Sequence, residues 1–324
     1  MTKRLVATIT AAAALGGLGL VGAPPALAHH DDGNGHGRPA SYALTGDPES
    51  SRFEGIGADQ RRGAFYVSEV TGGEIHRGDV RDGQTEEWLP AGADGRTTAR
   101  GITVDGDGNV YVAGGPNGLT GDRPDLWVYS PEGELLAALR VPADEAFLND
   151  VAIGPDGAAY FTDSNDPRIY RVAQGADGWE AEVWADATGT IERQEGFNLG
   201  GIVLSADRSA FVVAQGNTGD LWRFGFDGSV DAIDTGAADL VNADGLVRQG
   251  NRLTVVRNFD HALATLRLSA DGARARFVGE RATDPSKVFT TAKELRGRIL
   301  FVESEFGDGP ATPPYQVTTN PFAG

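Results

Sequence analysis

The fold can be predicted from one stretch of the chain, Phe147-Leu148-Asn149-Asp150-Val151-Ala152-Ile153-Gly154-Pro155-Asp156-Gly157-Ala158-Ala159-Tyr160-Phe161-Thr162-Asp163-Ser164. Alternating apolar residues lead into a Gly-Pro-Asp-Gly turn, and a second apolar run follows it. Such turn residues supply the backbone angles that a tight reversal needs, so the stretch predicts a β-hairpin. Asn149 and Asp150 stand at the start of its first strand, at the open end of the hairpin.

The same pattern recurs along the chain with a different residue at the position of Asn149, which we call the anchor. The anchors that we assign from the sequence are Glu54, Arg100, Asn149, Gly200, Asp244 and Ser286. Successive anchors are 46, 49, 51, 44 and 42 residues apart. A third apolar run follows most hairpins, as in Leu126-Trp127-Val128-Tyr129.

This repeat predicts an all-β fold, a six-bladed β-propeller with blades of four antiparallel strands. A blade of a propeller takes roughly 40 to 50 residues, which matches the spacing of the six anchors. An open sheet edge is normally covered, so we expect the first and last strands to close the ring in one blade. Ser41 to Gly46 and Tyr315 to Thr319 are the two segments with strand character nearest the ends.

The first 28 residues have the pattern of a secretory signal peptide. Lys3 and Arg4 precede an Ala-, Gly- and Leu-rich core that ends at Pro25-Ala26-Leu27-Ala28, a small-residue cleavage site. We expect cleavage after Ala28 and a secreted, extracellular protein; an uncleaved membrane anchor is the alternative. Residues 29–40 are polar and rich in His and Gly, so we expect a disordered lead-in before a single propeller domain at 41–324.

The composition restricts the partners. The chain has 46 acidic and 28 basic residues and no cysteine. Removal of Lys3 and Arg4 with the signal leaves a formal net charge near −20, which argues against nucleic acid as a partner. No segment after the signal is apolar enough for stable membrane association, and we expect a monomer that binds a small-molecule substrate or ligand.

In a propeller the anchors share one end of the central channel with the turns between the second and third strands. That end is therefore predicted to collect carboxylates, beginning with Glu54, Asp150 and Asp244 and continuing in the turns with Glu69, Asp163, Asp166, Asp260, Glu303 and Glu305. Oxygen ligands of this kind suit a hard divalent cation such as calcium.

The anchors resemble the metal-binding signatures of the senescence marker protein/gluconolactonase-like superfamily of six-bladed propellers. The resemblance rests on Glu54-Gly55, Asn149-Asp150 and Asp244-Gly245, and it extends from Tyr42 to Phe322. It implies one divalent cation, usually calcium, held by Glu54, Asn149 and Asp244, which polarises a lactone carbonyl or a phosphoester oxygen.

Two positions depart from the family pattern. Gly200 stands where the family has a fourth-blade Asn, so Asn198 is the candidate fourth ligand. Phe147 replaces an Arg of the sugar-lactone enzymes, and Arg100 is a candidate to bind another anion.

The candidate site residues follow from these observations. The resemblance implies that Asp244 is the base or nucleophile, and His261 lies in a turn at the same end, where a histidine could move a proton. Arg100, Asp150 and Asn258 are candidates for substrate binding. The metal ligands are predicted to be Glu54, Asn149, Asp244 and Asn198.

Three functional hypotheses remain open at this point. The first is a secreted, calcium-dependent hydrolase of a small ester, above all a lactone. The second is a secreted propeller that binds a ligand without catalysis. The third is a metal-free lyase or condensing enzyme. A propeller fold alone is compatible with all three.

Overall fold

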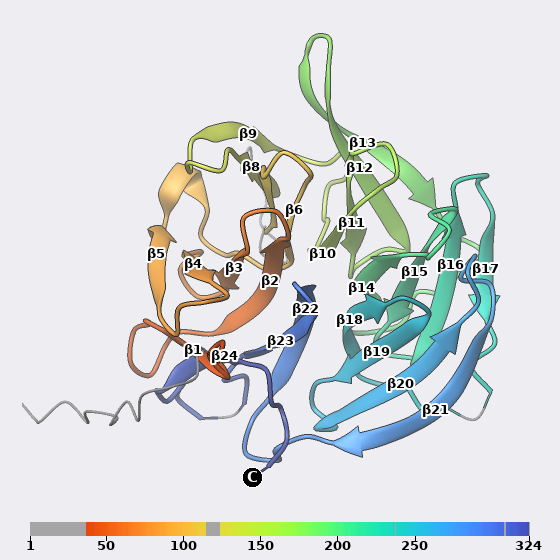
Figure 1. Ribbon diagram of the computed structural model, residues 1–324. Coiled ribbons are helices and arrows are strands. Elements are labelled where there is room, and N and C mark those ends of the chain that lie inside the picture. Colours follow the sequence, from red (N-terminus) through yellow and green to blue (C-terminus); the bar gives the residue numbers. More distant parts are fainter. Residues whose placement is uncertain (1–36, 115–123, 237, 308, 324) are drawn as a thin grey trace, which may run out of the picture. The chain divides into compact units, whose positions relative to one another are not determined.

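Six four-stranded antiparallel sheets surround a central channel in the computed structural model of the protein (Figure 1). The structure describes residues 37–114, 124–236, 238–307 and 309–323. The predicted signal peptide and most of the lead-in lie outside these residues. Residues 38–324 cluster as one unit, and the description below concerns this unit alone.

The strands follow one another in the order of the chain within each blade. Blade one contains β2 (Phe53–Asp59), β3 (Ala64–Glu69), β4 (Ile75–Asp79) and β5 (Thr85–Leu89). Blade two contains β6 (Ile102–Val104), β7 (Val110–Ala113), β8 (Leu126–Tyr129) and β9 (Leu135–Leu139), preceded by the short 3-10 helix Ala93–Gly95. Blade three contains β10 (Leu148–Ile153), β11 (Ala159–Asp163), β12 (Arg168–Gly175) and β13 (Gly178–Asp186).

The remaining blades complete the ring. Blade four contains β14 (Leu199–Leu204), β15 (Ala210–Gln215), β16 (Asp220–Gly225) and β17 (Val230–Ile233). Blade five contains β18 (Ala243–Gln249), β19 (Arg252–Arg257), β20 (Ala262–Leu268) and β21 (Ala275–Ala282). Blade six contains β22 (Phe289–Leu295), β23 (Arg298–Glu303), β24 (Tyr315–Thr318) and β1 (Ser41–Leu44). The predicted fold class is therefore confirmed.

The two ends of the described unit meet in blade six, as predicted. β1 is the outermost strand of this blade and pairs with β24, with Ser41 opposite Thr318. The hydrogen bonding continues N-terminal to β1, since Thr319 N donates to Ala40 O at 2.8 Å. The last residues of the predicted lead-in are thus attached to the propeller.

The hydrophobic core lies between the blades. The buried hydrophobic residues of the described chain form six clusters, and each cluster joins two adjacent blades. The cluster between blades six and one, for example, combines Phe53 and Phe65 with Tyr315 and Val317. Burial of this surface stabilises the ring blade by blade, without disulfides.

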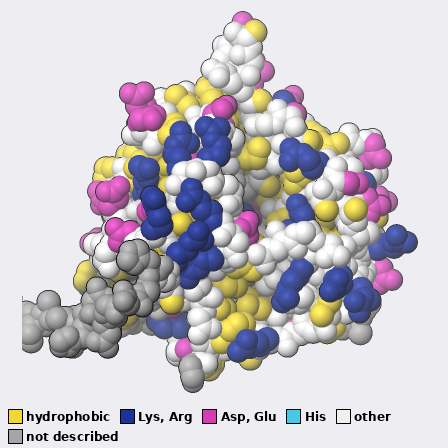
Figure 2. Space-filling view, viewed as in Figure 1, with side chains coloured by type: hydrophobic (Ala, Val, Ile, Leu, Met, Phe, Trp, Pro, Cys, Tyr) yellow, Lys and Arg dark blue, Asp and Glu magenta, His cyan; other side chains and the backbone are white. Residues whose placement is uncertain are grey.

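Charge is unevenly distributed over the surface. Figure 2 shows many Lys and Arg side chains on the face seen there, although the formal net charge of the chain is −18. Among the described residues, no helix has the length and apolar character needed to cross a membrane.

Glycine after the anchor lets neighbouring inner strands approach closely. A Cβ atom on Gly55, Gly101, Gly201 or Gly245 would lie closer than 3.0 Å to atoms of the inner strand of the next blade. Gly101 N donates to Asn149 O at 2.7 Å, which joins blades two and three directly. The inner strands therefore pack backbone against backbone around the channel.

We predict that Gly101→Ala destabilises the protein by about 1 to 3 kcal/mol or more, because the new methyl group overlaps Asn149 O and Asp150 Cα. Gly106→Ala is the matched control, since no atom lies within 4 Å of its Cβ position, and it should change the free energy of unfolding by less than about 0.5 kcal/mol. Urea unfolding measures both. Equal stabilities of the two variants would contradict the close-approach account.

A buried histidine predicts how stability depends on pH. His76 in β4 is 1% exposed, and neither ring nitrogen makes a hydrogen bond within the described residues, although Nε2 lies 3.5 Å from Glu74 Oε2. Burial lowers the pKa of His76 from 6.5 to about 4, against the opposing charge of Glu69. The unfolded chain therefore binds this proton first as the pH falls, and folding free energy is lost below pH 6.5.

Between pH 6.5 and pH 5 the loss from His76 should be about 1.6 kcal/mol, because the histidine of the unfolded chain is already half-protonated at pH 6.5. His76→Gln should remove this part of the pH dependence, measured as the difference in unfolding free energy between the two pH values. A variant with the pH dependence of the wild type would show that His76 is not the titrating group.

Candidate functional site

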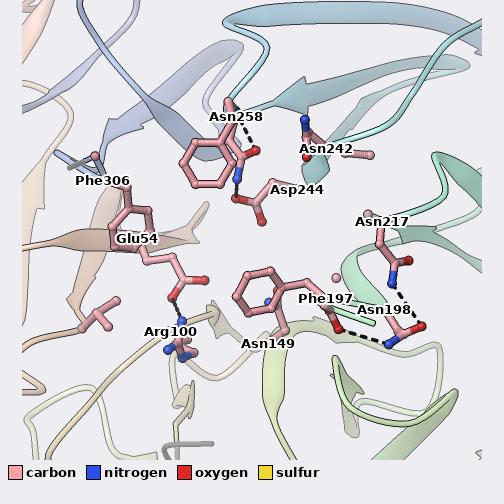
Figure 3. A pocket seen from close by; sticks show the side chains of 17 residues that line it. Glu54, Arg100, Asn149, Phe197, Asn198, Asn217, Asn242, Asp244, Asn258 and Phe306 are labelled. Atoms are coloured by element: carbon pink, nitrogen blue, oxygen red, sulfur yellow. Dashed lines mark hydrogen bonds and ion pairs between the residues drawn. The ribbon is translucent and has the colours of Figure 1, made fainter. Parts of the chain in front are cut away.

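The anchors of successive blades meet at one end of the channel around a pocket of about 600 Å³ (Figure 3). Glu54 comes from β2, Asn149 from β10, Gly200 from β14 and Asp244 from β18, and Arg100 lies two residues before the start of β6. In five blades the pairing of the first two strands shifts register at the anchor, as between Leu148 and Val151. This irregularity frees the anchor side chain from the regular alternation of the strand.

The sixth anchor predicted from the sequence is wrong. Ser286 is exposed, and its hydroxyl donates to Asp284 Oδ1 at 2.7 Å. The register of blade six pairs Phe289 with Glu303, as Leu148 pairs with Asp163 in blade three, so Thr290 holds the anchor position. Thr290 Oγ1 donates to Glu54 O at 2.8 Å and thereby joins blade six to blade one.

Two carboxylates form the floor of the pocket. Burial raises the pKa of Glu54 to about 7, with Arg100 opposing the shift. Removal from water and the charge of Glu54 raise the pKa of Asp244 well above its usual value, although Asn258 Nδ2 donates to Asp244 Oδ2 at 2.8 Å. The charge of Glu54 makes ionisation of Asp244 harder, the charge of Asp150 acts on both in the same direction, and a cation bound beside them would lower both pKa values.

Asn149 supplies a third oxygen at the floor. Its side chain is 8% exposed and makes no hydrogen bond to any described residue. Its Oδ1 lies over Gly200, 3.6 Å from where a Cβ of that residue would be. An amide without a partner at this depth is costly, so its environment fits an additional ligand.

Three oxygen-bearing side chains therefore converge: Glu54, Asn149 and Asp244. All three also line the narrow void beneath the pocket. Within the described ranges, no group of three or more His, Cys, Asp or Glu residues forms a metal site, and the set here has only two carboxylates. Two carboxylates and one amide fit a hard divalent cation with open coordination positions.

Asn198 does not fit the fourth ligand position for which we predicted it. Its Oδ1 accepts hydrogen bonds from Gln194 N, Gln215 Nε2 and Asn217 Nδ2, and its Nδ2 donates to three backbone carbonyls, those of Ser164, Gln194 and Gly196. The side chain is 1% exposed, and all of its hydrogen-bonding capacity is used. Asn198 holds the loop before β14 in place, and substrate or water must complete any metal shell.

Arg100 lies in the pocket, as expected for a substrate-binding residue. Its Nη1 is 3.5 Å from Glu54 Oε2, and its guanidinium lies 4.3 Å from the ring centre of Phe147. Nε of Arg100 is buried without a hydrogen-bond partner in the described structure. Arg100 thus places a positive charge between the ring of Phe147 and the carboxylate of Glu54.

Asp150 lies below the pocket, and the structure does not place it against a substrate. Its Oδ1 accepts from Val151 N at 2.8 Å and its Oδ2 from Ile202 N at 3.3 Å, while Lys293 Nζ lies 3.8 Å from Oδ1. The side chain joins β10 to β14 and is neutralised by Lys293. This corrects our assignment of Asp150 to substrate binding.

His261 is not among the residues that line the pocket. Its Nδ1 lies 2.8 Å from Lys287 O, to which it donates as the protonated ring nitrogen. This contact joins the turn after β19 to blade six. The position of His261 outside the pocket therefore does not support the proton-transfer role predicted for it.

The acidic residues that end the second strands have a structural task that the sequence did not reveal. Asp163 Oδ1 accepts from Phe147 N at 2.9 Å, and Glu69 Oε1 accepts from Arg52 N at 2.9 Å. Glu303 pairs with Lys287 Nζ at 3.1 Å. Each carboxylate thus holds the segment that leads into the inner strand of its own blade, instead of facing a ligand.

Three phenylalanines at the pocket were missed by the sequence analysis. Phe197, Phe259 and Phe306 line it from the loops of blades four, five and six. Figure 3 labels Phe197 and Phe306. The turns that contain these phenylalanines vary from blade to blade, so the repeated hairpin pattern does not identify them. The sequence indicates them only by an aromatic residue within three residues of an anchor or of the end of a second strand.

Comparison with known proteins assigns the chain to a family. The model of the SMP-30/Gluconolactonase/LRE-like region matches residues 53–246. The chain belongs to this family. The match includes the three converging side chains at the floor and confirms the resemblance identified from the anchors.

Solved structures share the fold at low sequence identity. A gluconolactonase from Xanthomonas campestris has 16% identity and a TM-score of 0.59 over 87% of this chain and 97% of its own. Regucalcin from Agrobacterium tumefaciens, described as a calcium-binding protein, has 15% identity and a TM-score of 0.57 over 88% and 96%. Virginiamycin B lyase from Staphylococcus aureus has 16% identity and a TM-score of 0.58 over 81% and 80%. No curated protein sequence matches the chain.

We predict that Asn198→Ala destabilises the protein by about 2 to 3 kcal/mol, because it leaves several buried polar groups without partners. The control is Asn165→Ala, whose half-buried side chain makes a single side-chain hydrogen bond, to Glu145 O, and which should cost less than about 1 kcal/mol. Thermal and urea unfolding test the difference. An Asn198→Ala protein of normal stability that has lost its affinity for calcium would instead make Asn198 a ligand.

Proposed function

We propose that this protein is a secreted hydrolase of a small neutral ester, above all a lactone, that depends on a divalent cation such as calcium. The observation that carries the proposal is the convergence of Glu54, Asn149 and Asp244 beneath a pocket of small-molecule size. The family match and the likeness to a gluconolactonase and to a calcium-binding regucalcin support it.

The three oxygen ligands would hold the cation at the pocket floor. A divalent cation bound there supplies Lewis acidity, which polarises the carbonyl of the ester. Glu54 and Asp244 balance its charge, and Asn149 adds a neutral donor. The shell stays incomplete because Gly200 offers no side chain, which leaves room for substrate oxygen.

Asp244 is the residue that we assign to proton transfer. Asn258 fixes one of its oxygens, so the carboxylate is oriented for proton transfer at the pocket floor. In hydrolysis the oxygen of water bonds to the acyl carbon, and Asp244 takes the proton of that water. The acyl C–O bond then breaks, and the proton passes to the departing alkoxide, which gives a hydroxy acid from a lactone.

Arg100 is assigned to binding. Its guanidinium lies between Glu54 and the ring of Phe147, and its buried Nε–H has no hydrogen-bond partner among the residues that the structure describes. This places a fixed positive charge beside the carboxylates, where it can stabilise oxygen atoms of the substrate or of the acid product.

The alternative is a propeller that binds a ligand without catalysis. It is favoured by Gly200 and by the commitment of Asn198 to its own loop, which leave the cation with three protein side chains. Turnover separates the two functions, since a binding propeller saturates with ligand and releases it unchanged.

We predict that calcium stabilises the chelator-treated protein, by about 2.7 kcal/mol when free calcium exceeds its dissociation constant a hundredfold. Asp244→Asn should lose most of this stabilisation and all lactone hydrolysis while keeping the strand content of the wild type. Thermal unfolding with calcium and with chelator, together with circular dichroism, measures the effect.

Asp220→Asn is the matched control, because it removes the same charge from an exposed strand residue outside the pocket. It should respond to calcium as the wild type does. Unfolding curves of the wild type that do not change with calcium or chelator would remove the proposed mechanism and leave the binding propeller.

A further inference from the structure

The pocket is surrounded by aromatic rings at its mouth. Phe197 is 54% exposed and Phe259 is 53% exposed, more than any other large hydrophobic side chain in the described chain, and Phe306 is half-buried. Exposed phenylalanine side chains usually occur singly on a protein surface, so a cluster of them indicates a binding site. Burial of such rings against a ligand stabilises the complex. We call these three residues the aromatic collar.

The collar is built into the frame of the site. Phe197 packs against Phe147 with ring centres 5.5 Å apart, and Phe147 in turn lies under the guanidinium of Arg100. Phe259 N donates to Asn258 Oδ1 at 2.7 Å, and the same Asn258 holds Asp244. The rings are thereby linked to the catalytic floor and do not belong to separate surface loops.

Several polar residues of the wall are bonded to one another or to the backbone. Asn198 uses both ends of its amide, and so does Asn258. Asn242 Nδ2 is bonded to Asp260 Oδ2, and Asn217 Nδ2 to Glu195 O. The donors left to a ligand are the amide of Asn149, Nε of Arg100 and the second Nδ2 hydrogens of Asn242 and Asn258. A sugar lactone, with a hydroxyl on nearly every carbon, would also place hydroxyl groups against the three phenyl rings, which offer no comparable hydrogen bond, at a cost for each.

The charge at the floor limits the ligand further. Without a cation, Arg100 offsets only one of the two carboxylates, Glu54 and Asp244, so the floor repels anions; with a divalent cation, the floor and Arg100 together carry a positive charge. A neutral carbonyl compound is compatible with both conditions, whereas an anion fits only the second. The apolar remainder of such a ligand would face the collar.

We propose that this site takes neutral lactones or esters that carry an aromatic or similarly flat apolar group, and that Phe197 and Phe259 select them over polyhydroxylated sugar lactones. This inference rests on the proposed hydrolase function for its chemistry, but not for its binding geometry. The reaction is the ester hydrolysis given above, with the acyl C–O bond cleaved by water.

Binding of unreactive lactams tests the selectivity separately from turnover. The lactam analogues of dihydrocoumarin (3,4-dihydroquinolin-2-one) and of gluconolactone (gluconolactam) are titrated by calorimetry into the full chain with calcium present. We expect the aromatic lactam to bind at least tenfold more tightly. The double variant Phe197→Ala/Phe259→Ala should lose at least tenfold for the aromatic lactam and change gluconolactam binding less than twofold.

Leu135→Ala is the control, because it truncates an exposed apolar side chain outside the pocket and should change neither affinity. Calcium affinity and melting temperature of the double variant should equal those of the wild type. Gluconolactam binding that equals or exceeds that of the aromatic lactam, an aromatic affinity that does not depend on the two phenylalanines, or no binding of either lactam would overturn the inference.

The lactones themselves separate this inference from the proposed function. If dihydrocoumarin is not hydrolysed while its lactam binds through the collar, the hydrolase proposal fails and the selectivity stands. If gluconolactone is hydrolysed faster than dihydrocoumarin and independently of the two rings, the hydrolase proposal stands and the collar inference fails.

Discussion

The close approach of the inner strands around the channel is the constraint on which the rest of the structure depends. Glycine follows the anchor in four blades, and any side chain there would meet the backbone or side chains of the next inner strand. The blades are then joined by short hydrogen bonds such as that from Gly101 N to Asn149 O. This packing directs the residue before each glycine to the mouth of the channel, and so it creates the candidate site.

The polar residues around the channel divide into two groups with different tasks. Asp163, Glu69 and Asn198 use their side chains to hold the segments before the inner strands, which fixes the backbone of the anchors. Glu54, Asn149 and Asp244 are left with incomplete partners at the floor. The residues that hold the backbone have hydrogen-bond partners, whereas those at the pocket floor lack some of theirs. This arrangement is expected where a bound ligand supplies the missing partners.

Much of the fold follows from the sequence because the hairpin pattern repeats at a nearly constant interval. The assignment failed at Ser286, where blade six has Thr290-Thr291 in place of an anchor and a glycine. A better signal was Phe301-Val302-Glu303-Ser304, which parallels Phe161-Thr162-Asp163-Ser164 and identifies the second strand whose last residue, Glu303, pairs with the residue before the anchor position.

The site was less predictable than the fold. Residue type and spacing brought Glu54, Asn149, Asp244, Arg100 and Asn258 together, because the propeller fixes where anchors and turns lie. Residue type and spacing could not show that the Asn198 amide is hydrogen-bonded within its own loop or that Asp150 is paired with Lys293. Packing between blades determines those partners. The aromatic collar was missed for the same reason.

The central claim is that the pocket floor binds one divalent cation through side-chain oxygens of Glu54, Asn149 and Asp244. The most direct test is crystallographic. Crystals grown with manganese in place of calcium would be measured for anomalous scattering at the manganese edge. We expect one peak per chain within about 2.6 Å of oxygens of Glu54, Asn149 and Asp244. A map without a peak there, in crystals whose pocket is open to solvent, would contradict the account.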